Sequence, residues 1–162
     1  MNDPHAIEDF WQECRAAVPG LPPAVPEAWA FGATPAQADG LLALVRAGTK
    51  TATASSLWDY EFSGDPLPEP GLLNIILDGS GAPRALLETV SVEIVPFSEV
   101  QESHAFAEGE GDRSLSSWRE THERYWREHS EDPRGFEPDM PVVCERLHVI
   151  YTPTGSRETG PA

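Results

Sequence analysis

The segment TPAQADGLLALVRAGTKTATAS (34–55) predicts a helix followed by an extended segment, and this junction organises the rest of the chain. Thr34 and Gln37 have the spacing of a capping box, in which side chains bind the free N–H groups at a helix start. Gly48 is a typical stop at a helix C-terminus. The threonines beyond it favour extended structure. The helix is therefore expected to end just before Lys50, the only lysine in the chain.

One amphipathic helix is predicted before this segment, and strands with a helical insertion are predicted after it. Apolar residues recur at helical spacing over residues 4–18, and the proline-rich residues 19–28 cannot continue that helix. Helices followed by mostly antiparallel strands indicate an α+β fold with a curled sheet. The further strands are expected at 72–78, 84–97 and 142–151, and the further helices at 114–129 and in a short segment capped by Ser98.

The composition indicates one acidic domain. A chain of 162 residues is long enough for one hydrophobic core, and its formal net charge is −16. Sequence-independent binding to duplex DNA needs a basic surface that displaces counterions, and this chain does not offer one over most of its surface. Any contact with nucleic acid is therefore expected to be local, with a single strand or a free nucleoside as the partner.

Several features of the sequence concern the location of the protein. No apolar run is long enough to span a membrane, and the N-terminus lacks the basic and apolar regions of a signal peptide. Cys14 and Cys144 show no metal-binding spacing, which favours buried, reduced thiols over a disulfide. These features predict a cytoplasmic protein with no membrane partner.

Lys50 and Thr53 have a spacing that suits nucleophilic catalysis. A neutral lysine accepts a proton from a hydroxyl group, and the hydroxyl oxygen then attacks a carbonyl carbon. Such chemistry requires burial to favour the neutral amine. The structural alternative is a cation placed after a helix C-terminus, where the helix dipole stabilises it. On spacing alone, this alternative is favoured.

Glu88 and Glu93 interrupt the long apolar strand expected at 84–97. Their odd separation places them on opposite faces of a regular strand. A buried carboxylate is unfavourable unless it is paired, so the inward one would need a partner such as Lys50. A β-bulge would instead allow both side chains to face water.

The segments EGEGD (108–112) and WRETH (118–122) hold the other candidate groups. Clustered carboxylates suit Mg²⁺ or Mn²⁺, but a turn whose carboxylates serve the start of the next helix is the favoured alternative. A tryptophan would stack on a base and an arginine would bind phosphate, although such a helix face is more often core. The candidates are Glu108, Glu110 and Asp112 for a metal ion, and Trp118, Arg119 and His122 for a substrate.

The motifs that resemble a known family follow one another in order over residues 29–151. They are WAFG, ADGLLALVRAGTKTATAS, LPEPG, IVPFSEV, EGEGD with the following WR and H, and VVCERLHVIY. Together they resemble the ASCH domain family, in particular its EGEGD-bearing branch. The resemblance implies a PUA-like fold, which is a small curled β-barrel with flanking helices. One such domain would cover residues 1–151, with 1–28 as a helical extension and 152–162 as a disordered tail.

The resemblance also links the chain to RNA. Some members hydrolyse N4-acetylcytidine with a Lys, Thr and Glu constellation, which would fall on Lys50, Thr53 and Glu88 and needs no cofactor. Other members are ribonucleases of single strands that use a metal such as Mg²⁺ or Mn²⁺. A third alternative is a non-catalytic reader of RNA or a modified nucleotide, with Trp58 or Trp118 as the stacking surface. The small amidohydrolases lack the EGEGD–WR–H segment, so the three alternatives stay open.

Overall fold

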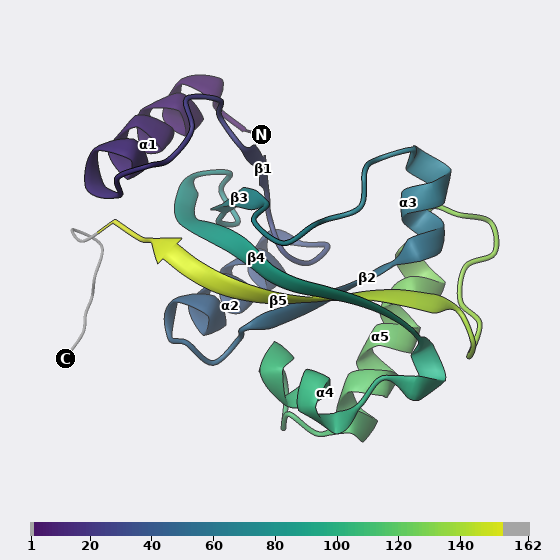
Figure 1. Ribbon diagram of the computed structural model, residues 1–162. Coiled ribbons are helices and arrows are strands. Elements are labelled where there is room, and N and C mark those ends of the chain that lie inside the picture. Colours follow the sequence, from purple (N-terminus) through teal and green to yellow (C-terminus); the bar gives the residue numbers. More distant parts are fainter. Residues whose placement is uncertain (1, 154–162) are drawn as a thin grey trace. The chain divides into compact units, whose positions relative to one another are not determined.

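The computed structural model describes residues 2–153, which form a five-stranded sheet and five α-helices (Figure 1). Residues 154–162 of the expected disordered tail lie outside the described residues. The helices are α1 (Pro4–Ala17), α2 (Pro35–Arg46), α3 (Leu57–Ser63), α4 (Glu102–Glu108) and α5 (Leu115–His129), with a 3₁₀ turn at Phe97–Glu99. The strands are β1 (Glu27–Trp29), β2 (Ala52–Ser56), β3 (Leu73–Leu77), β4 (Pro83–Pro96) and β5 (Pro141–Tyr151).

The sheet is mostly antiparallel, as the sequence predicts. Its strand order is β1-β3-β4-β5-β2. β3 pairs with β4 and β2 pairs with β5 in antiparallel fashion, whereas β1 pairs with β3 in parallel. The sequence did not predict β1, because a strand of three residues beside a proline-rich segment has no measurable periodicity.

The described chain forms two compact units. The first comprises the chain up to Arg46, Leu73–Glu88, and the chain from His148 onward. The second comprises Ala47–Leu72 and Thr89–Leu147. The long strands β4 and β5 each contribute residues to both units.

The first unit is built on α1, β3 and β4. Asp3 caps α1 by accepting a hydrogen bond from the N–H group of His5. Trp11 is fully buried, and its indole N–H donates to the carbonyl oxygen of Pro23 at 3.2 Å, so the proline-rich segment lies against this helix. The buried apolar residues of this core are Phe10, Trp11, Cys14, Ile75, Leu77 and Leu86.

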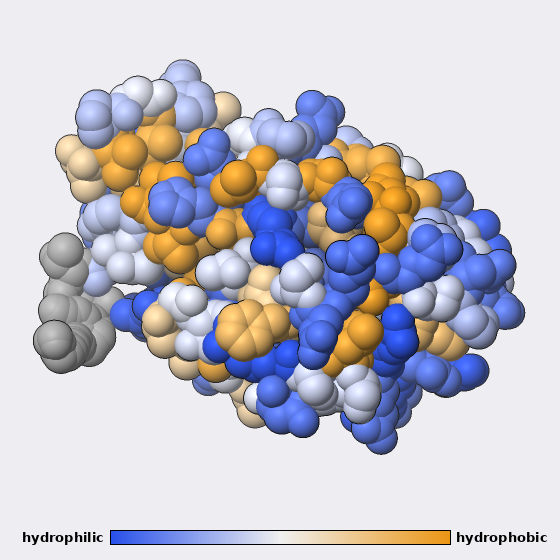
Figure 2. Space-filling view, turned by 60° about the horizontal axis from the view of Figure 1, so that its bottom comes forward, coloured by the Kyte–Doolittle hydropathy of each residue, from blue (hydrophilic) through white to orange (hydrophobic). Residues whose placement is uncertain are grey.

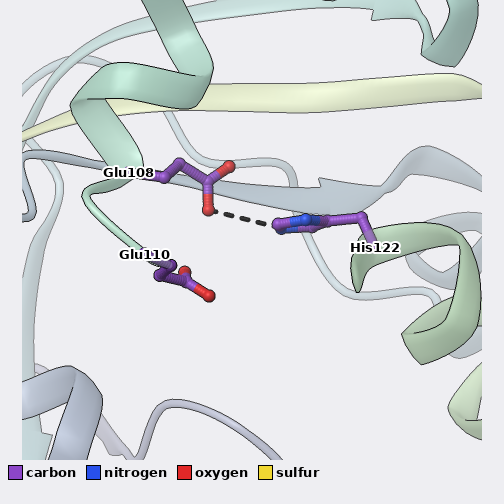
Figure 3. Close-up of side chains that lie close together, drawn as sticks. All are labelled: Glu108, Glu110 and His122. Atoms are coloured by element: carbon purple, nitrogen blue, oxygen red, sulfur yellow. Dashed lines mark ion pairs between the residues drawn. The ribbon is translucent and has the colours of Figure 1, made fainter. Parts of the chain in front are cut away.

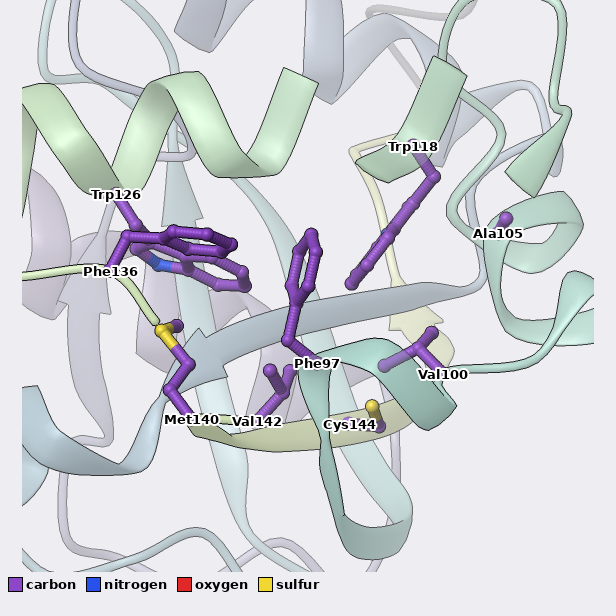
Figure 4. Packing of buried hydrophobic residues seen from close by; sticks show 9 residues of the cluster. All are labelled: Phe97, Val100, Ala105, Trp118, Trp126, Phe136, Met140, Val142 and Cys144. Atoms are coloured by element: carbon purple, nitrogen blue, oxygen red, sulfur yellow. The ribbon is translucent and has the colours of Figure 1, made fainter. Parts of the chain in front are cut away.

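The second unit has an aromatic core between α5 and the sheet strands (Figure 4). The ring of Phe97 stacks on Trp118 with 5.4 Å between centroids and meets Phe136 edge-on at 4.8 Å. Trp118 and Trp126 anchor α5 in this core. The cluster comprises Phe97, Val100, Ala105, Trp118, Trp126, Phe136, Met140, Val142 and Cys144.

The helix starts agree with the sequence at α2 and α5 but not at α4. The Thr34 hydroxyl accepts a hydrogen bond from the N–H group of Gln37, and Ser114 caps α5 in the same way. Ser98 was expected to cap the short helix, but it lies in the 3₁₀ turn, and α4 starts after Gln101. Propensity alone does not fix such a boundary, because the aromatic core holds the preceding turn.

Both cysteines are buried free thiols, as the sequence predicts. Burial raises the pKa of Cys14 and of Cys144 to about 12, so neither is a reactive thiolate at neutral pH.

The surface carries separate apolar residues among polar ones. The face in Figure 2 shows apolar patches divided by hydrophilic residues, and exposed apolar side chains include Phe62, Val90 and Phe106. Single exposed apolar residues are common on protein surfaces. Among residues 2–153, no helix combines the length and the apolar character that crossing a membrane requires.

Candidate functional site

Lys50 lies in the second unit and is buried, with 3% of the residue exposed. Gly48, at φ +82°, ends the turn that follows α2 and directs the chain into β2. The Lys50 ammonium then folds over the start of β2, where Nζ donates to the carbonyl oxygen of Ala52 at 2.9 Å. The only lysine is therefore an internal cation rather than a solvated one at a helix end.

Two carboxylates from the EGEGD segment lie against this ammonium. Lys50 Nζ is 3.0 Å from Glu110 Oε2 and 3.4 Å from Glu108 Oε1. The Glu108 side chain is 1% exposed, and that of Glu110 is 28% exposed. Glu110 therefore lies at the solvent-exposed edge of the cluster, and Glu108 lies at its buried end.

Glu108 is the centre of a buried network, part of which is shown in Figure 3. Its Oε2 accepts from Trp118 Nε1 at 2.8 Å and lies 2.7 Å from His104 Nε2. Its Oε1 is 3.3 Å from His122 Nε2. Burial alone would raise the pKa of Glu108, but the charges of His122 and Lys50 and the histidine hydrogen bonds hold it well below its ordinary value. Glu108 is therefore a carboxylate at neutral pH.

A hydrogen bond to the backbone defines the proton on Nδ1 of His122. Its Nδ1 is 2.8 Å from the carbonyl oxygen of Trp118, which only accepts hydrogen bonds, so Nδ1 carries a proton. Nε2 then faces Glu108, and the ring stacks on Trp118 with 4.2 Å between centroids. Burial lowers the pKa of His122, but the charge of Glu108 outweighs this and raises it above the ordinary value. The raised pKa favours an imidazolium that donates to Glu108.

The EGEGD turn is pressed onto the Lys50 segment by backbone packing. Gly109 has φ +76°, and a Cβ atom there would lie 2.5 Å from the carbonyl oxygen of Thr49. The N–H group of Thr51 donates to the carbonyl oxygen of Ala107 at 2.7 Å. Arg113 spans the two segments, because its guanidinium donates to the carbonyl oxygens of Phe106 and Thr49. Only glycine permits this close approach at position 109.

Gly109→Ala is expected to lower the free energy of unfolding by about 1–2 kcal/mol more than Gly64→Ala does. Both glycines follow a helix C-terminus with a positive φ, but a Cβ at Gly64 meets nothing within 4 Å. Urea unfolding of the two variants isolates the contact with Thr49 from the backbone strain that they share. Equal losses in the two variants would contradict the close packing.

Thr53 lies on the other face of β2 from the Glu108 network. It pairs with Glu145 across β2 and β5, while its neighbour Ala54 packs against the aromatic core that contains Trp118. Its side chain forms no hydrogen bond within residues 2–153. Thr53 and Lys50 are thus close in sequence, but their functional groups have different surroundings.

Glu145, opposite Thr53, is a second buried carboxyl group. One of its oxygens accepts a hydrogen bond from the hydroxyl of Thr89 at 3.0 Å. Burial raises the pKa of Glu145, and the Thr89 hydrogen bond offsets this only in part. A raised carboxyl pKa means that this group's contribution to stability is fully present below its ordinary pKa and is lost as pH rises through the folded-state value.

The free energy of unfolding of Glu145→Gln, relative to that of the wild type, is therefore expected to increase as the pH is raised from about 4 to about 7. Glutamine keeps the acceptor for Thr89 and cannot ionise. Urea unfolding at both pH values measures the difference. Glu120→Gln, on the exposed part of α5, controls for the loss of one negative charge. If the difference in free energy of unfolding between the wild type and Glu145→Gln did not change with pH, the raised pKa of Glu145 would be contradicted.

Glu88 lies on the part of β4 that belongs to the first unit. It is half-buried, pairs with Leu73 across the strands, and forms no side-chain ion pair within the described residues. Glu93 is exposed on the same strand. The carboxylates against Lys50 come instead from Glu108 and Glu110, and a catalytic role for Glu88 stays a prediction.

The remaining predicted site residues have structural surroundings. Asp112 is exposed and accepts from the N–H group of Ser114 at the start of α5. Trp118 is 4% exposed, which leaves no free ring face for a base. Arg119 donates to backbone carbonyl oxygens of Ser98 and Val100, and the ring of Trp58 lies under the guanidinium of Arg134 at 4.6 Å.

The atoms that could hold a metal ion come from Glu108, Glu110 and His122. One ligand atom from each lies within 4.8 Å of the other two. The first two residues are among the predicted metal ligands, whereas Asp112 does not belong to this group. Sequence reasoning missed His104, although its spacing of four residues from Glu108 on a helix is a usable signal.

Comparison with known families adds to this geometry. The model of the ASCH domain family matches residues 27–151. The chain belongs to the ASCH domain family. In this ASCH protein, α1 precedes the matched residues, and the predicted single domain over 1–151 stays a prediction.

Two solved structures show the same fold. A protein of Enterococcus faecalis is 38% identical, with a TM-score of 0.82, and the match covers 90% of this chain and 88% of that one. The ASCH domain of Lactobacillus crispatus is 28% identical, with a TM-score of 0.82 and coverage of 91% and 95%. The predicted α+β, PUA-like fold is confirmed. No curated protein matches the chain.

Proposed function

We propose that this ASCH protein is an RNA-linked hydrolase that cleaves the amide of an acylated nucleoside such as N4-acetylcytidine. The observation that carries the proposal is the Lys50 ammonium, which is buried between Glu108 and Glu110. The side chains of His104, Trp118 and His122 in turn hold the carboxylate of Glu108 in place. Amide hydrolysis is accelerated by a fixed positive charge or hydrogen-bond donor at the developing oxyanion and by a base, such as a carboxylate, that accepts a proton. The cluster supplies both charges at one place.

Lys50 and Glu110 would divide this work. The ammonium would donate to the oxygen of the substrate carbonyl, and the carboxylate of Glu110 would accept the proton of the attacking hydroxyl group. The oxygen of that group forms a bond to the carbonyl carbon, the C–N bond breaks, and the proton passes to the leaving nitrogen. The side chain of Glu110 is 28% exposed, so it can rotate toward solvent to admit a substrate.

The attacking group would be water, or the hydroxyl of Thr53, in which case a water molecule would then hydrolyse the acetyl ester formed on Thr53 and release acetate. In the sequence-based hypothesis, Thr53 attacks with Lys50 as its base, but the Lys50 ammonium already donates to a carbonyl and two carboxylates. A nitrogen that donates to three acceptors has no lone pair directed at Thr53. This arrangement favours Lys50 as the electrostatic group and Glu110 as the base.

The substrate class follows from the charge distribution. The net charge of −16 opposes a long RNA, and two nearby arginines are occupied by backbone carbonyls, namely Arg113 and Arg119. Arg127 pairs with Glu123. A small, weakly charged nucleoside fits these surroundings better than a polyphosphate strand.

The proposal is tested by acetate release from N4-acetylcytidine. Glu110→Gln is expected to lower kcat/KM by about 100-fold or more, the usual contribution of a general base. Glu120→Gln, an exposed glutamate on α5, is the matched control and is expected to keep full activity. Thr53→Ala separates the two nucleophiles, because activity survives only if water attacks. Absence of acetate release by the wild-type protein would overturn the proposal.

One observation favours a second candidate, a metal-dependent ribonuclease of single strands. The atoms of Glu108, Glu110 and His122 lie close enough together to share a divalent ion. The residues present fit such an ion, which would supply a Lewis acid for phosphodiester cleavage. Cleavage of a short labelled RNA that needs Mn²⁺ or Mg²⁺, stops with EDTA and is lost in His122→Gln would support this candidate over the amidohydrolase.

A further inference from the structure

The Glu108–Glu110–His122 cluster has the supporting contacts of a metal site, not only its ligand atoms. A histidine that binds a metal through Nε2 normally donates its Nδ1 proton to a carbonyl oxygen or a carboxylate. His122 does this with the carbonyl oxygen of Trp118 at 2.8 Å. On Glu108, Trp118 and His104 hold Oε2, which leaves Oε1 directed at the cluster. Both ligands are therefore fixed in orientation by the protein.

The ammonium of Lys50 lies against the same carboxylate oxygens that a metal ion would use. Nζ is 3.0 Å from Glu110 Oε2 and 3.4 Å from Glu108 Oε1, and the Lys50 side chain is 1% exposed. A divalent ion bound to these oxygens would lie within a few ångströms of the ammonium. Charges of the same sign repel each other strongly at that distance in a buried site, and the repulsion doubles for a divalent ion.

We propose that the Lys50 ammonium occupies a transition-metal site whose ligands are Glu108, Glu110 and His122. The ammonium and a divalent ion would compete for the carboxylates of Glu108 and Glu110, so only one of them binds there at a time. One imidazole nitrogen with two carboxylate oxygens suits Zn²⁺ or Co²⁺ better than Mg²⁺ or Ca²⁺, which prefer oxygen alone. The ligand atoms lie within 4.8 Å of one another, and a rotation of the partly exposed Glu110 side chain would bring them within bonding distance of one ion.

This inference goes beyond the proposed hydrolysis and does not rest on it. The protein balances the charge of its buried carboxylates with the Lys50 side chain, and removal of this side chain converts the cluster into a metal centre. The ribonuclease candidate with an ion at this cluster would then require the ammonium of Lys50 to leave the two carboxylates first.

The test measures Co²⁺ binding by its visible absorption and by calorimetry. The full chain is compared as wild type, Lys50→Met, Lys50→Arg and Lys50→Met/His122→Gln. Lys50→Met is expected to bind one equivalent of Co²⁺ at least about 100-fold more tightly than the wild type, because the competing charge is gone. Lys50→Arg keeps the charge and is expected to behave as the wild type. The double variant is expected to lose the site.

A matched control distinguishes this site from surface histidines. Lys50→Met/His129→Gln removes an exposed histidine on α5 and is expected to keep the Co²⁺ site. Equal Co²⁺ affinity of the wild type and Lys50→Met would overturn the inference, and so would a folded Lys50→Met protein that binds none. If Lys50→Met does not fold alone, Zn²⁺ titration followed by circular dichroism replaces the measurement. Recovery of structure then supports the inference, and no recovery overturns it.

Discussion

Lys50→Met is expected to lower the free energy of unfolding by about 3–5 kcal/mol at neutral pH, because it removes one of the cations that balance the buried carboxylate of Glu108. Glu108 and Lys50 both have side chains that are 1% exposed, so water cannot replace the lost ammonium. Methionine keeps the length and the apolar stem of lysine, which limits the packing change. Urea unfolding of the two proteins under the same buffer conditions measures the loss.

The control for this prediction is the double variant Lys50→Met/Glu108→Gln. A neutral glutamine side chain still offers an oxygen to Trp118 and no longer needs a cation, so the double variant is expected to recover part of the lost stability. A loss below about 1 kcal/mol in Lys50→Met would mean that the pair contributes no more than an exposed ion pair does. The central role assigned to Lys50 would then be wrong.

Trp118→Phe is expected to lower the free energy of unfolding by about 2–4 kcal/mol. The indole N–H of Trp118 donates to Glu108 Oε2 at 2.8 Å in a buried environment, and phenylalanine has no donor. A hydrogen bond to a charged group contributes about 1.5–3 kcal/mol, and the smaller ring leaves a cavity in the aromatic core. Urea unfolding at neutral pH gives the value.

Trp126→Phe is the matched control, because Trp126 belongs to the same buried cluster and its indole forms no hydrogen bond within residues 2–153. It reports the change in ring size without the lost donor. Equal losses in the two variants would show that Trp118 stabilises the protein by packing alone. The hydrogen bond from Trp118 would then not hold the carboxylate of Glu108 in place, as the hydrolase proposal requires.

Much of the fold could be read from local patterns. The capping residue Thr34 marks the start of α2, and periods of 3.6 and 2 locate α1, α5, β3, β4 and β5. The helix α3 was missed because it has only seven residues and buries none of them fully. α4 is equally short but buries four residues, so it was the lack of a buried face that left α3 without a helical pattern.

The sequence identified residues of the candidate site, but it did not show which of them are in contact. The sequence singled out Lys50 as the only lysine and EGEGD as a cluster of carboxylates. It did not show that they meet, because Lys50 and Glu108 are 58 residues apart and no local period relates them. Glu88 was the carboxylate nearest to a family pattern, whereas the turn at Gly109 brings Glu108 to the ammonium.

The sequence by itself determined the α+β class, the family, the acidic surface and the two segments that carry the charged groups, because these depend on composition and on local periods. The tertiary structure decided which charges are partners and which face each residue occupies. Burial then turned Lys50 and Glu108 from two surface candidates into one internal ion pair, since charges that leave water must be paired.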